Sequence, residues 1–230
     1  MTSIAPAMLS VRQELAERYL AGDGIEIGAL DSPLPVPARA RVRYVDRVSV
    51  AQLRGYYPEL ADRELFEPDL IEDGEQLPTI GSGSLDFIIA NHMLEHCENP
   101  LGTMRTHLDR IRSGGVLYYA IPDKRQCFDL PRPLTSFEHL LQDDVDNGAQ
   151  SRWSHYLEWA IHVNGLNEPA AAEENARANM HNAYSIHFHV WDPDAFHRFL
   201  RSAQGYLQVS FAIEHFRENG TEAIAILRKQ

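Results

Sequence analysis

Cysteine and long apolar runs are scarce in this chain of 230 residues, and each scarcity narrows what the protein can be. The two cysteines, Cys97 and Cys127, lie far apart and outside any Cys-x-x-Cys pattern, so we expect free thiols in a reducing cytoplasm rather than a disulfide. No apolar run approaches the ~18 residues that span a membrane, and the first residues lack the features of a secretory signal. A cytoplasmic protein without a membrane partner is therefore expected.

Basic residues are also few relative to acidic ones. The sequence has 21 Lys and Arg residues against 33 Asp and Glu residues, which gives a formal net charge of −12. Such a chain would on average repel a phosphate backbone, so no nucleic-acid partner is expected. The length is sufficient for one sizeable α/β domain with insertions, or for two small domains at most, and we predict a single domain over residues 1–230.

Short apolar segments alternate with helical patterns over the first half of the chain. Residues 9–21 and 101–115 carry apolar side chains at helical spacing and predict two amphipathic helices. Strands are predicted, in chain order, at residues 24–30, 42–47, 67–73, 85–91 and 116–122. Alternating strands and helices are typical of right-handed βαβ units and a parallel sheet. Ligands of such sheets bind at the carboxyl ends of the strands, so the residues that follow each strand are the candidates for a site.

The second half of the chain interrupts this alternation. Residues 124–183 contain helical pieces joined by polar connections, and we predict that they form an inserted helical cap over the strand ends. The pattern resumes at residues 187–203, where Asp192 and Pro193 are a suitable cap and first residue for a helix. The dipeptide Asn219-Gly220 then separates two apolar segments and predicts a terminal β-hairpin.

Several short motifs, taken in this order, resemble those of the class I S-adenosylmethionine-dependent methyltransferases. They are IEIGAL at 25–30, Asp46 at the end of the second strand, EDGEQLP at 72–78, GSLDFIIANHMLEH at 83–96, SGGVLYYAIP at 113–122 and HFHVWDPDAFHRFL at 187–200. The resemblance covers residues 25–123 and 185–228. It implies an α/β fold with a Rossmann-like, seven-stranded, mostly parallel methyltransferase sheet, a terminal antiparallel hairpin and flanking helices. The inserted cap is similar to that of small-molecule and sugar O-methyltransferases.

The same resemblance implies S-adenosyl-L-methionine as the cofactor. Gly28 would let the backbone approach a ligand closely at a tight turn. Asp46 follows it by 18 residues, close to the ~20 typical of ribose-binding acids, and could accept both ribose hydroxyls. We expect the cofactor to be bound by Glu26, Gly28, Ala29, Asp46, Arg47, Asp73, Gly74, Glu75, Asn91 and His92.

The first motif departs from the family pattern. Ala29, Leu30 and Ser32 occupy positions where further glycines are common, and DSPLPVP at 31–37 follows in place of a plain helix. A binding protein that has kept the scaffold and lost the cofactor is therefore an alternative to an enzyme.

A second alternative comes from His92, Glu95 and His96, which spell H-x-x-E-H, a zinc signature of metalloproteases. Such a site needs its ligands on one long helix, whereas His92 here directly follows a buried strand and is predicted to lie in a turn. We expect His92 to line the cofactor cleft, and Glu95 and His96 to hold a helix to the sheet. A zinc hydrolase is the competing interpretation.

Histidine is abundant: eleven are present, and eight of them follow residue 138. Methyl transfer to a hydroxyl requires alignment and removal of a proton, for which histidine is suited at neutral pH. We predict a general base among His155, His187 and His189. The last two would share one face of a strand, and Glu158 lies within helical reach of His155 and could orient it. Hydrogen-bonded core or surface histidines are the alternative.

The acceptor is expected to contact Asp123, Arg125, Trp153 and Tyr156. Arg125 could bind a hydroxyl-rich or carboxylated molecule, and the two aromatic rings could stack on a sugar face, although their helical spacing also fits a cap core. No metal ligand is assigned. A divalent ion such as Mg²⁺, bound by Asp123, Asp129 or a histidine pair, is a further hypothesis that the spacing does not require.

Taken together, these patterns predict a cytoplasmic O-methyltransferase that uses S-adenosylmethionine and a histidine base. Its acceptor is expected to be a hydroxyl of a saccharide or a similar polar small molecule. N- or C-methylation of a small metabolite is the alternative within the enzyme class, and a homodimer is left open.

Overall fold

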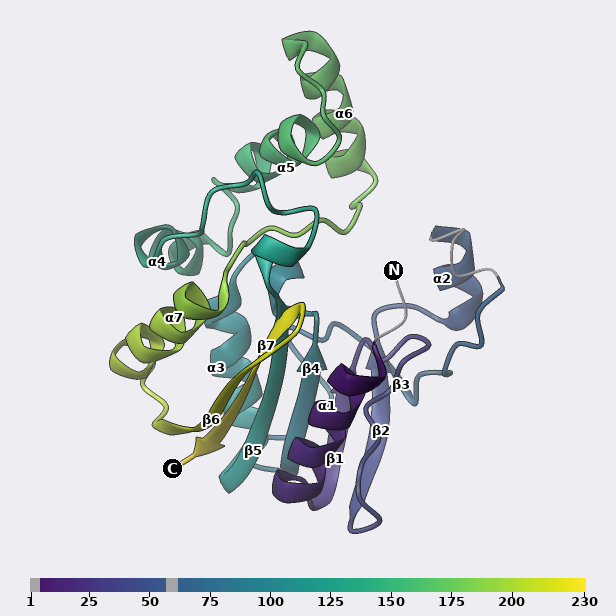
Figure 1. Ribbon diagram of the computed structural model, residues 1–230, viewed down its shortest axis with the longest axis vertical. Helices are drawn as coiled ribbons and strands as arrows, with labels where there is room; N and C mark the ends of the chain where they lie inside the picture. The colour runs from purple at the N-terminus through teal and green to yellow at the C-terminus, as the bar shows by residue number, and fades with distance from the viewer. Residues whose placement is uncertain (1–4, 57–61) are drawn as a thin grey trace.

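A mixed seven-stranded sheet forms the centre of the protein, and helices lie on both of its faces (Figure 1). The computed structural model describes residues 5–56 and 62–230. Its strands are β1 (Gly22–Ile27), β2 (Ala40–Asp46), β3 (Leu70–Ile71), β4 (Leu85–Asn91), β5 (Ile111–Pro122), β6 (Phe211–Asn219) and β7 (Glu222–Lys229). Its helices are α1 (Pro6–Tyr19), α2 (Val50–Tyr56), α3 (Pro100–Arg110), α4 (Phe137–Asp146), α5 (Arg152–His162), α6 (Pro169–His181) and α7 (Pro193–Tyr206), with short 3-10 helices η2 (Leu94–His96) and η3 (Lys124–Gln126).

The strand order is β3-β2-β1-β4-β5-β7-β6. The first five strands of this order are parallel, and β7 is antiparallel to both β5 and β6. The predicted fold class, a mostly parallel methyltransferase sheet with a terminal antiparallel hairpin, is therefore confirmed. The order reverses between β1 and β4, and the crevice at such a reversal is where ligands of these sheets bind.

Two element boundaries differ from the sequence prediction. The third strand is only Leu70–Ile71, because the Asp69 side chain accepts the Tyr44 N–H at 2.7 Å and replaces part of the backbone ladder. The helix predicted over 101–115 ends at Arg110, and its terminal glycines belong to β5. A Cβ at Gly115 would lie 2.7 Å from a backbone oxygen of the neighbouring strand, so this glycine permits close strand approach rather than ending the helix.

Both faces of the sheet are buried. The residues of β4 are apolar on both sides, as expected for a central parallel strand. One face packs against α3 and α7, and the other against α1. The start of α7 is as predicted, since the Asp192 side chain accepts the Ala195 N–H at 2.7 Å and Pro193 is the first helical residue.

The segment between β5 and α7 contains α4, α5 and α6. Helix α4 lies near α3 and contributes Leu140 to the sheet core, whereas α5 and α6 form a separate apolar cluster with Ile186 and Phe188. In Figure 1 the α5–α6 pair extends beyond the edge of the sheet at which β5 ends. None of the helices in the described ranges has the length and apolarity needed to cross a membrane.

Candidate active site

Two cavities lie at the carboxyl ends of the parallel strands. The first cavity has a volume of about 440 Å³ and the second a volume of about 610 Å³. The residues that line both are Gly28, Leu30, His92, His96, Phe128 and His187. Because the two cavities share this wall, a ligand bound in one would face a ligand bound in the other. The wall is built from the ends of β1 and β4 and from the segment between β5 and α7.

The first cavity collects residues that follow β1, β2, β3 and β4. Those expected to bind the cofactor that line it are Gly28, Asp46, Arg47, Asp73, Gly74, Glu75 and His92. The others, Glu26, Ala29 and Asn91, line the second cavity. Their convergence follows from the topology, since the carboxyl ends of parallel strands meet at one edge of a sheet.

The turns after β1 and β4 have unusual backbone conformations. Gly28 has a φ of 68°, and a Cβ built on it would meet nothing within 4 Å, so its backbone is open to a ligand. Leu30 and His92 also lie in the left-handed region, with φ of 50° and 52°. Left-handed residues other than glycine are uncommon and concentrate at functional sites, and both of these line both cavities.

Two carboxylates give the first cavity its polar character. Burial raises the pKa of Asp46, at the end of β2, above its usual value. Burial and the nearby Asp73 raise the pKa of Glu75 to about 7. Gly74 packs directly on Ile27, because a Cβ there would lie 2.5 Å from the Ile27 side chain. The cavity therefore presents acceptor oxygens on a loop that is fixed against β1.

Glu26 has a different role from the other expected cofactor residues. Its side chain is buried, and both oxygens lie 3.0 Å from the Leu34 N–H, so it anchors the loop that follows β1. Burial raises its pKa to about 7. Asn91, at the end of β4, has a buried amide whose oxygen and nitrogen find no hydrogen-bond partner among the described residues. Asn91 itself lines the second cavity, so its unsatisfied amide lies at the edge of that space.

His187 is the candidate base that the structure brings to the shared wall. Its Nδ1 lies 2.6 Å from Asp129 Oδ2, and Arg132 donates to the other Asp129 oxygen at 2.7 Å. Although burial opposes it, the hydrogen bonds from His187 and Arg132 lower the pKa of the Asp129 carboxyl below its ordinary value. An ionised Asp129 can accept the Nδ1 proton of His187, and a ring that carries its proton on Nδ1 has Nε2 as an acceptor.

The H-x-x-E-H residues do not assemble as a zinc site of the metalloprotease type. His92 lies in the turn, as predicted, and its Nε2 is 2.9 Å from Glu222. Glu95 and His96 lie in the 3-10 helix η2 rather than on a long helix. The group of ligand atoms that converges within 4.8 Å here joins Glu95 and His96 to His187 and leaves His92 out.

Glu95 and His96 bind the segment before α7 rather than α3. The Glu95 carbonyl accepts the N–H groups of Phe188 and His189, and His96 Nδ1 lies 2.8 Å from the Ile186 carbonyl. Burial raises the pKa of Glu95 and lowers that of His96 to about 3, so the His96 ring is uncharged at neutral pH. The short helix η2 also contacts α3 and β5, so the expectation that these residues hold helix to sheet stays a prediction beside the observed bonds to the irregular segment.

His155 and His189 line neither of the two cavities. They meet the buried Asp143 and the partly exposed His139 in a group, here called the sealed cluster because it opens into neither cavity, between α4, α5 and the segment before α7. The expectation that His187 and His189 share a strand face was wrong, because residues 184–190 form no strand. The irregular backbone there directs the two rings to different surroundings.

Glu158 does not orient His155. It lies on α5 and accepts a hydrogen bond from Arg132 Nε at 2.8 Å. The ring of His155 instead has its Nε2 3.0 Å from Nε2 of His139. Three-residue helical spacing made the expected pairing geometrically allowed, but a buried guanidinium is a stronger partner for a carboxylate than a neutral imidazole.

Asp123 and Arg125 pair with each other. Asp123 is buried at the end of β5, and both of its oxygens accept from Arg125 Nε at 2.9 Å. Arg125 also contacts Glu218 at 3.2 Å. Neither residue lines either cavity. Their sequence neighbours Pro122 and Gln126 line the second cavity instead. With Asp123 bound to Arg125 and Asp129 to Arg132, these carboxylates are engaged by guanidinium groups rather than converging on a cation.

The aromatic residues of α5 are arranged differently from the expectation. Trp153 lies under the Arg177 guanidinium, 4.9 Å from its ring centroid, and Tyr156 is buried with its hydroxyl donating to the Tyr184 carbonyl. Neither lines the two cavities. Trp159 and Tyr184 line the first cavity instead. Helical periodicity identified the apolar face of α5 but not which end of that face meets the cavity.

A network that sequence reasoning missed joins α1, β4 and β7 at the second cavity. Arg12 donates two hydrogen bonds to the buried Glu222, which also bonds to His92 and Asn219. Although burial opposes it, hydrogen bonds from Arg12 and His92 lower the pKa of Glu222 to about 2. The signal in the sequence was a charged residue, Arg12, on the apolar face of the first helix.

Comparison with protein families agrees with this geometry. A family model described as a methyltransferase domain matches residues 15–205. The chain belongs to this methyltransferase family. It is an S-adenosylmethionine-dependent methyltransferase, which confirms the family resemblance, the enzyme class and the cofactor predicted from the motifs. No curated protein matches the sequence significantly.

Solved structures share the fold of this methyltransferase at low sequence identity. A Rhodobacter sphaeroides protein named as a candidate zinc-dependent alcohol dehydrogenase has a TM-score of 0.54 and 14% identity, with 98% of this chain and 90% of that chain covered. A chain from the Haloferax volcanii complex of the Trm112 activator with its candidate methyltransferase has a TM-score of 0.51 and 11% identity, with coverage of 96% and 88%. YcgJ from Bacillus subtilis has a TM-score of 0.50 and 11% identity, with coverage of 97% of each chain.

The first cavity of this methyltransferase fits the cofactor despite its altered first motif. Gly28 leaves open space above the turn where additional glycines are common in the family. Asp46 presents a carboxylate that can accept ribose hydroxyls, and the loop Asp73–Glu75 lines the same cavity. The residues present therefore suit a bound nucleoside with a polar tail.

Proposed function

We propose that this methyltransferase methylates a hydroxyl of a polar small molecule, such as a saccharide, and that His187 is the general base. The observation that carries the proposal is the position of His187. It lines both cavities, and its Nδ1 is hydrogen-bonded to the buried Asp129 at 2.6 Å. A base that takes a proton during methyl transfer has to stand where the methyl donor and the acceptor meet.

The hydrogen-bond pattern favours base function over a structural role. Asp129 fixes the ring of His187 with Nδ1 as donor, and Arg132 in turn fixes Asp129. The Nε2 atom of a ring held in this way can accept the hydroxyl proton, and the resulting imidazolium is stabilised by the carboxylate. His155 and His189 line neither cavity, so neither ring can reach an acceptor hydroxyl there, and the proposed base is His187.

The lining of the second cavity supports a hydroxyl-rich acceptor. Its volume of about 610 Å³ is within the usual range for small-molecule sites. Asn91, Gln126 and Thr221 supply polar side chains, and the half-exposed ring of Phe128 supplies an apolar surface beside His187. This mixture of hydrogen-bonding groups with one exposed ring suits a sugar, which has polar edges and an apolar face.

The segment 124–183 would act as a cap in this scheme, together with the residues that connect it to α7. It supplies Phe128 and Trp159 to the cavity walls, and the following residues supply Tyr184, Ser185 and His187. Acceptor recognition and proton removal would thus come from the inserted part, whereas cofactor recognition would come from the sheet.

The cofactor supplies an electrophilic methyl group when it is bound. The chain's own contribution is to hold the ribose through Asp46, to approach the ligand with the Gly28 backbone, and to place the acceptor oxygen against Nε2 of His187. The leaving group needs no metal ion, because a sulfonium departs as a neutral thioether.

The proposal is tested first by calorimetric titration with S-adenosylmethionine and its demethylated product, followed by a screen of sugars and sugar nucleotides for release of that product. The variant His187→Ala should reduce turnover of the identified acceptor by about 10²–10⁴-fold, the usual contribution of general acid–base catalysis. Its affinity for S-adenosylmethionine should remain within about threefold of wild type, since Asp46 and the Gly28 turn are unchanged.

The matched control is His181→Ala on the exposed end of α6, which should retain wild-type turnover. Full turnover in His187→Ala would contradict the base assignment. Activity confined to amine or carbon acceptors would contradict the O-methylation proposal while leaving the enzyme class intact.

A further inference from the structure

The sealed cluster brings three imidazoles and one carboxylate to a single point. His139 and Asp143 lie one turn apart on α4, His155 lies on α5, and His189 lies in the segment before α7. Their ligand atoms are all within 4.8 Å of one another. His139 Nε2 is 3.0 Å from His155 Nε2 and 3.2 Å from Asp143 Oδ2, and His189 Nε2 is 3.7 Å from that same oxygen.

Several of these atoms are buried without a satisfactory partner. Asp143 is 1% exposed; Ser151 donates to its Oδ1, but its Oδ2 has no hydrogen-bond partner among the described residues. His189 is fully buried, its Nδ1 is likewise unpartnered, and its Nε2 makes only a long contact of 3.4 Å with the Glu98 carbonyl. Unpaired buried polar atoms are costly, and Asp143 Oδ2, which faces the Nε2 atoms of His139 and His189, is one that a bound cation would satisfy.

His107 shows how this protein otherwise accommodates a buried histidine. Its Nδ1 lies 2.9 Å from the Tyr119 hydroxyl and its Nε2 2.8 Å from the Gly74 carbonyl, so both nitrogens are hydrogen-bonded to neutral groups. In the sealed cluster, two imidazole nitrogens instead face each other and a carboxylate oxygen. That arrangement is typical of a shared cation rather than of a hydrogen-bonded core.

We propose that the sealed cluster is a structural zinc site, with its three histidines and Asp143 as the four ligands. A tetrahedral zinc ion with bonds of about 2.0–2.1 Å separates its ligand atoms by about 3.3–3.4 Å. The separations of 3.0, 3.2 and 3.7 Å bracket that spacing. Nitrogen ligands with one carboxylate suit zinc, whereas magnesium and calcium prefer an all-oxygen set.

The electrostatics are consistent with a bound cation. Burial lowers the pKa of His155 to about 3 and holds that of His189 well below its usual value, so both rings are in the neutral form that coordinates metal. Burial raises the pKa of the Asp143 carboxyl although Ser151 and His139 oppose that rise, and a divalent ion at the cluster would favour the ionised form.

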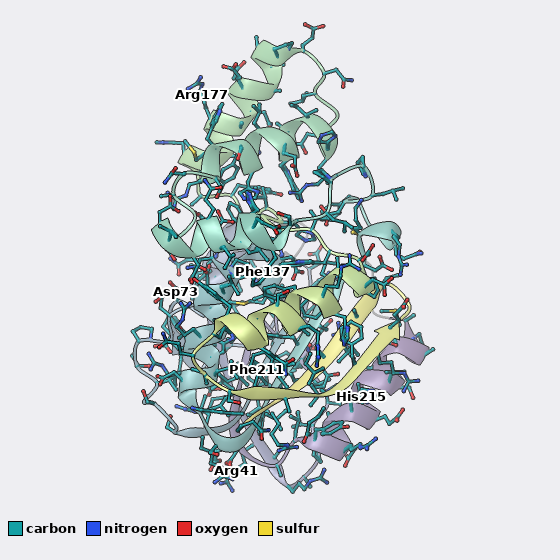
Figure 2. All side chains as sticks on the ribbon, turned by 90° about the vertical axis from the view of Figure 1, so that its left-hand side faces the viewer. Arg41, Asp73, Phe137, Arg177, Phe211 and His215 are labelled. Atoms are coloured by element: carbon teal, nitrogen blue, oxygen red, sulfur yellow. The ribbon has the colours of Figure 1, made fainter. Side chains whose placement is uncertain are left out.

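The location points to a structural rather than a catalytic ion. The four ligands come from three separate pieces of the chain between β5 and α7, and four protein ligands would complete the tetrahedral shell of a structural zinc ion. In Figure 2, α4 with Phe137 at its start lies between α7 and the α5–α6 pair on which Arg177 is labelled. An ion at this junction would join the α5–α6 pair to α4 and to the segment that carries His187.

The test uses protein produced without a polyhistidine tag. Elemental analysis should find about one equivalent of zinc, and protein stripped by a chelator should take up one equivalent of Co²⁺ with the visible spectrum of tetrahedral coordination. The variants Asp143→Asn and His155→Ala should each lower zinc affinity at least tenfold, whereas His162→Ala, at an exposed position on the same helix α5, should bind zinc as wild type does.

His187→Ala locates the ion, because His187 belongs to the other converging group with Glu95 and His96. Retention of zinc in His187→Ala and its loss in Asp143→Asn support the proposal. Loss of zinc in His187→Ala alone would move the ion to the cavity wall and overturn it. Wild-type protein that binds neither zinc nor Co²⁺ after stripping and reloading would also overturn it, and that result requires no variant to fold.

Discussion

The segment before α7 sends two histidines to opposite environments. His187 reaches the wall shared by both cavities, and Asp129, itself bonded to Arg132, holds its Nδ1. His189, two residues later, is fully buried in the sealed cluster and has an unpartnered Nδ1. The first ring therefore has a carboxylate behind it and a cavity in front of it, and the second has potential metal ligands around it.

This difference shows that residue type alone does not set a histidine's role. A ring with one nitrogen fixed and the other facing a ligand cavity can move a proton. A ring that lines neither cavity and lies among other imidazoles and a buried carboxylate cannot exchange protons with an acceptor, but it can bind a cation. The comparison can be tested by changing each side of it separately.

The largest expected effect separates stability from catalysis within this one segment. His189→Ala should lower the free energy of unfolding by about 3 kcal/mol, because it removes a fully buried ring and a proposed zinc ligand. His187→Ala should lower it by less, about 1–2 kcal/mol, because it removes one buried hydrogen bond while Asp129 keeps Arg132 as a partner.

Urea denaturation of both variants provides the measurement. A chelator should lower the free energy of unfolding of the wild type towards that of His189→Ala. It should lower the free energy of unfolding of His187→Ala by the same amount as that of the wild type. Equal destabilisation by the two substitutions would remove the distinction between the two clusters.

The second prediction concerns Asp129 as a positioning residue. Asp129→Asn should lower kcat about 100-fold, because an amide cannot both accept the His187 Nδ1 proton and pair with Arg132, so the ring loses its fixed tautomer. The KM for acceptor and the affinity for S-adenosylmethionine should change little. Glu158→Gln is the matched control, since it bonds to the far side of the same Arg132. An equal loss of kcat in both variants would assign the effect to Arg132 rather than to His187.

The sheet and the first cavity could be predicted from sequence because their signals are local. Each parallel strand is an apolar run, and the residues that follow it are brought to one edge by the topology itself. That is why Gly28, Asp46 and His92 were expected where they are found. The errors at β3 and α3 arose where a side chain or a glycine replaced regular backbone pairing.

The inserted region could not be predicted to the same degree. The Asp129–His187 pair spans 58 residues, and the Arg12–Glu222 pair spans 210, so no spacing rule links either pair. Periodicity indicated that α5 is amphipathic, but it could not distinguish Trp159 at the cavity from its buried neighbours. The partner of a residue such as Glu158 depends on which helices pack together, and that information is not local.

The smallest expected effect uses His107 as a reference for a buried histidine with both nitrogens satisfied. Burial lowers its pKa to about 4, below the 6.5 of an exposed ring. The unfolded chain therefore takes up this proton first as the pH falls, so the associated stability is complete above pH 6.5 and is lost progressively towards pH 4. Between pH 6.5 and 5.5 that loss amounts to about 1 kcal/mol.

His107→Gln removes this titration while offering the Tyr119 hydroxyl and the Gly74 carbonyl a polar partner. Between pH 6.5 and 5.5, the free energy of unfolding of this variant should therefore fall by about 1 kcal/mol less than that of the wild type. Urea denaturation at both pH values measures the difference. An unchanged pH dependence would mean that His107 is not held neutral by its surroundings. His107 could then no longer serve as the example of a buried histidine whose hydrogen bonds are satisfied. The contrast with the unpartnered atoms of the sealed cluster, from which we infer an ion, would be weakened.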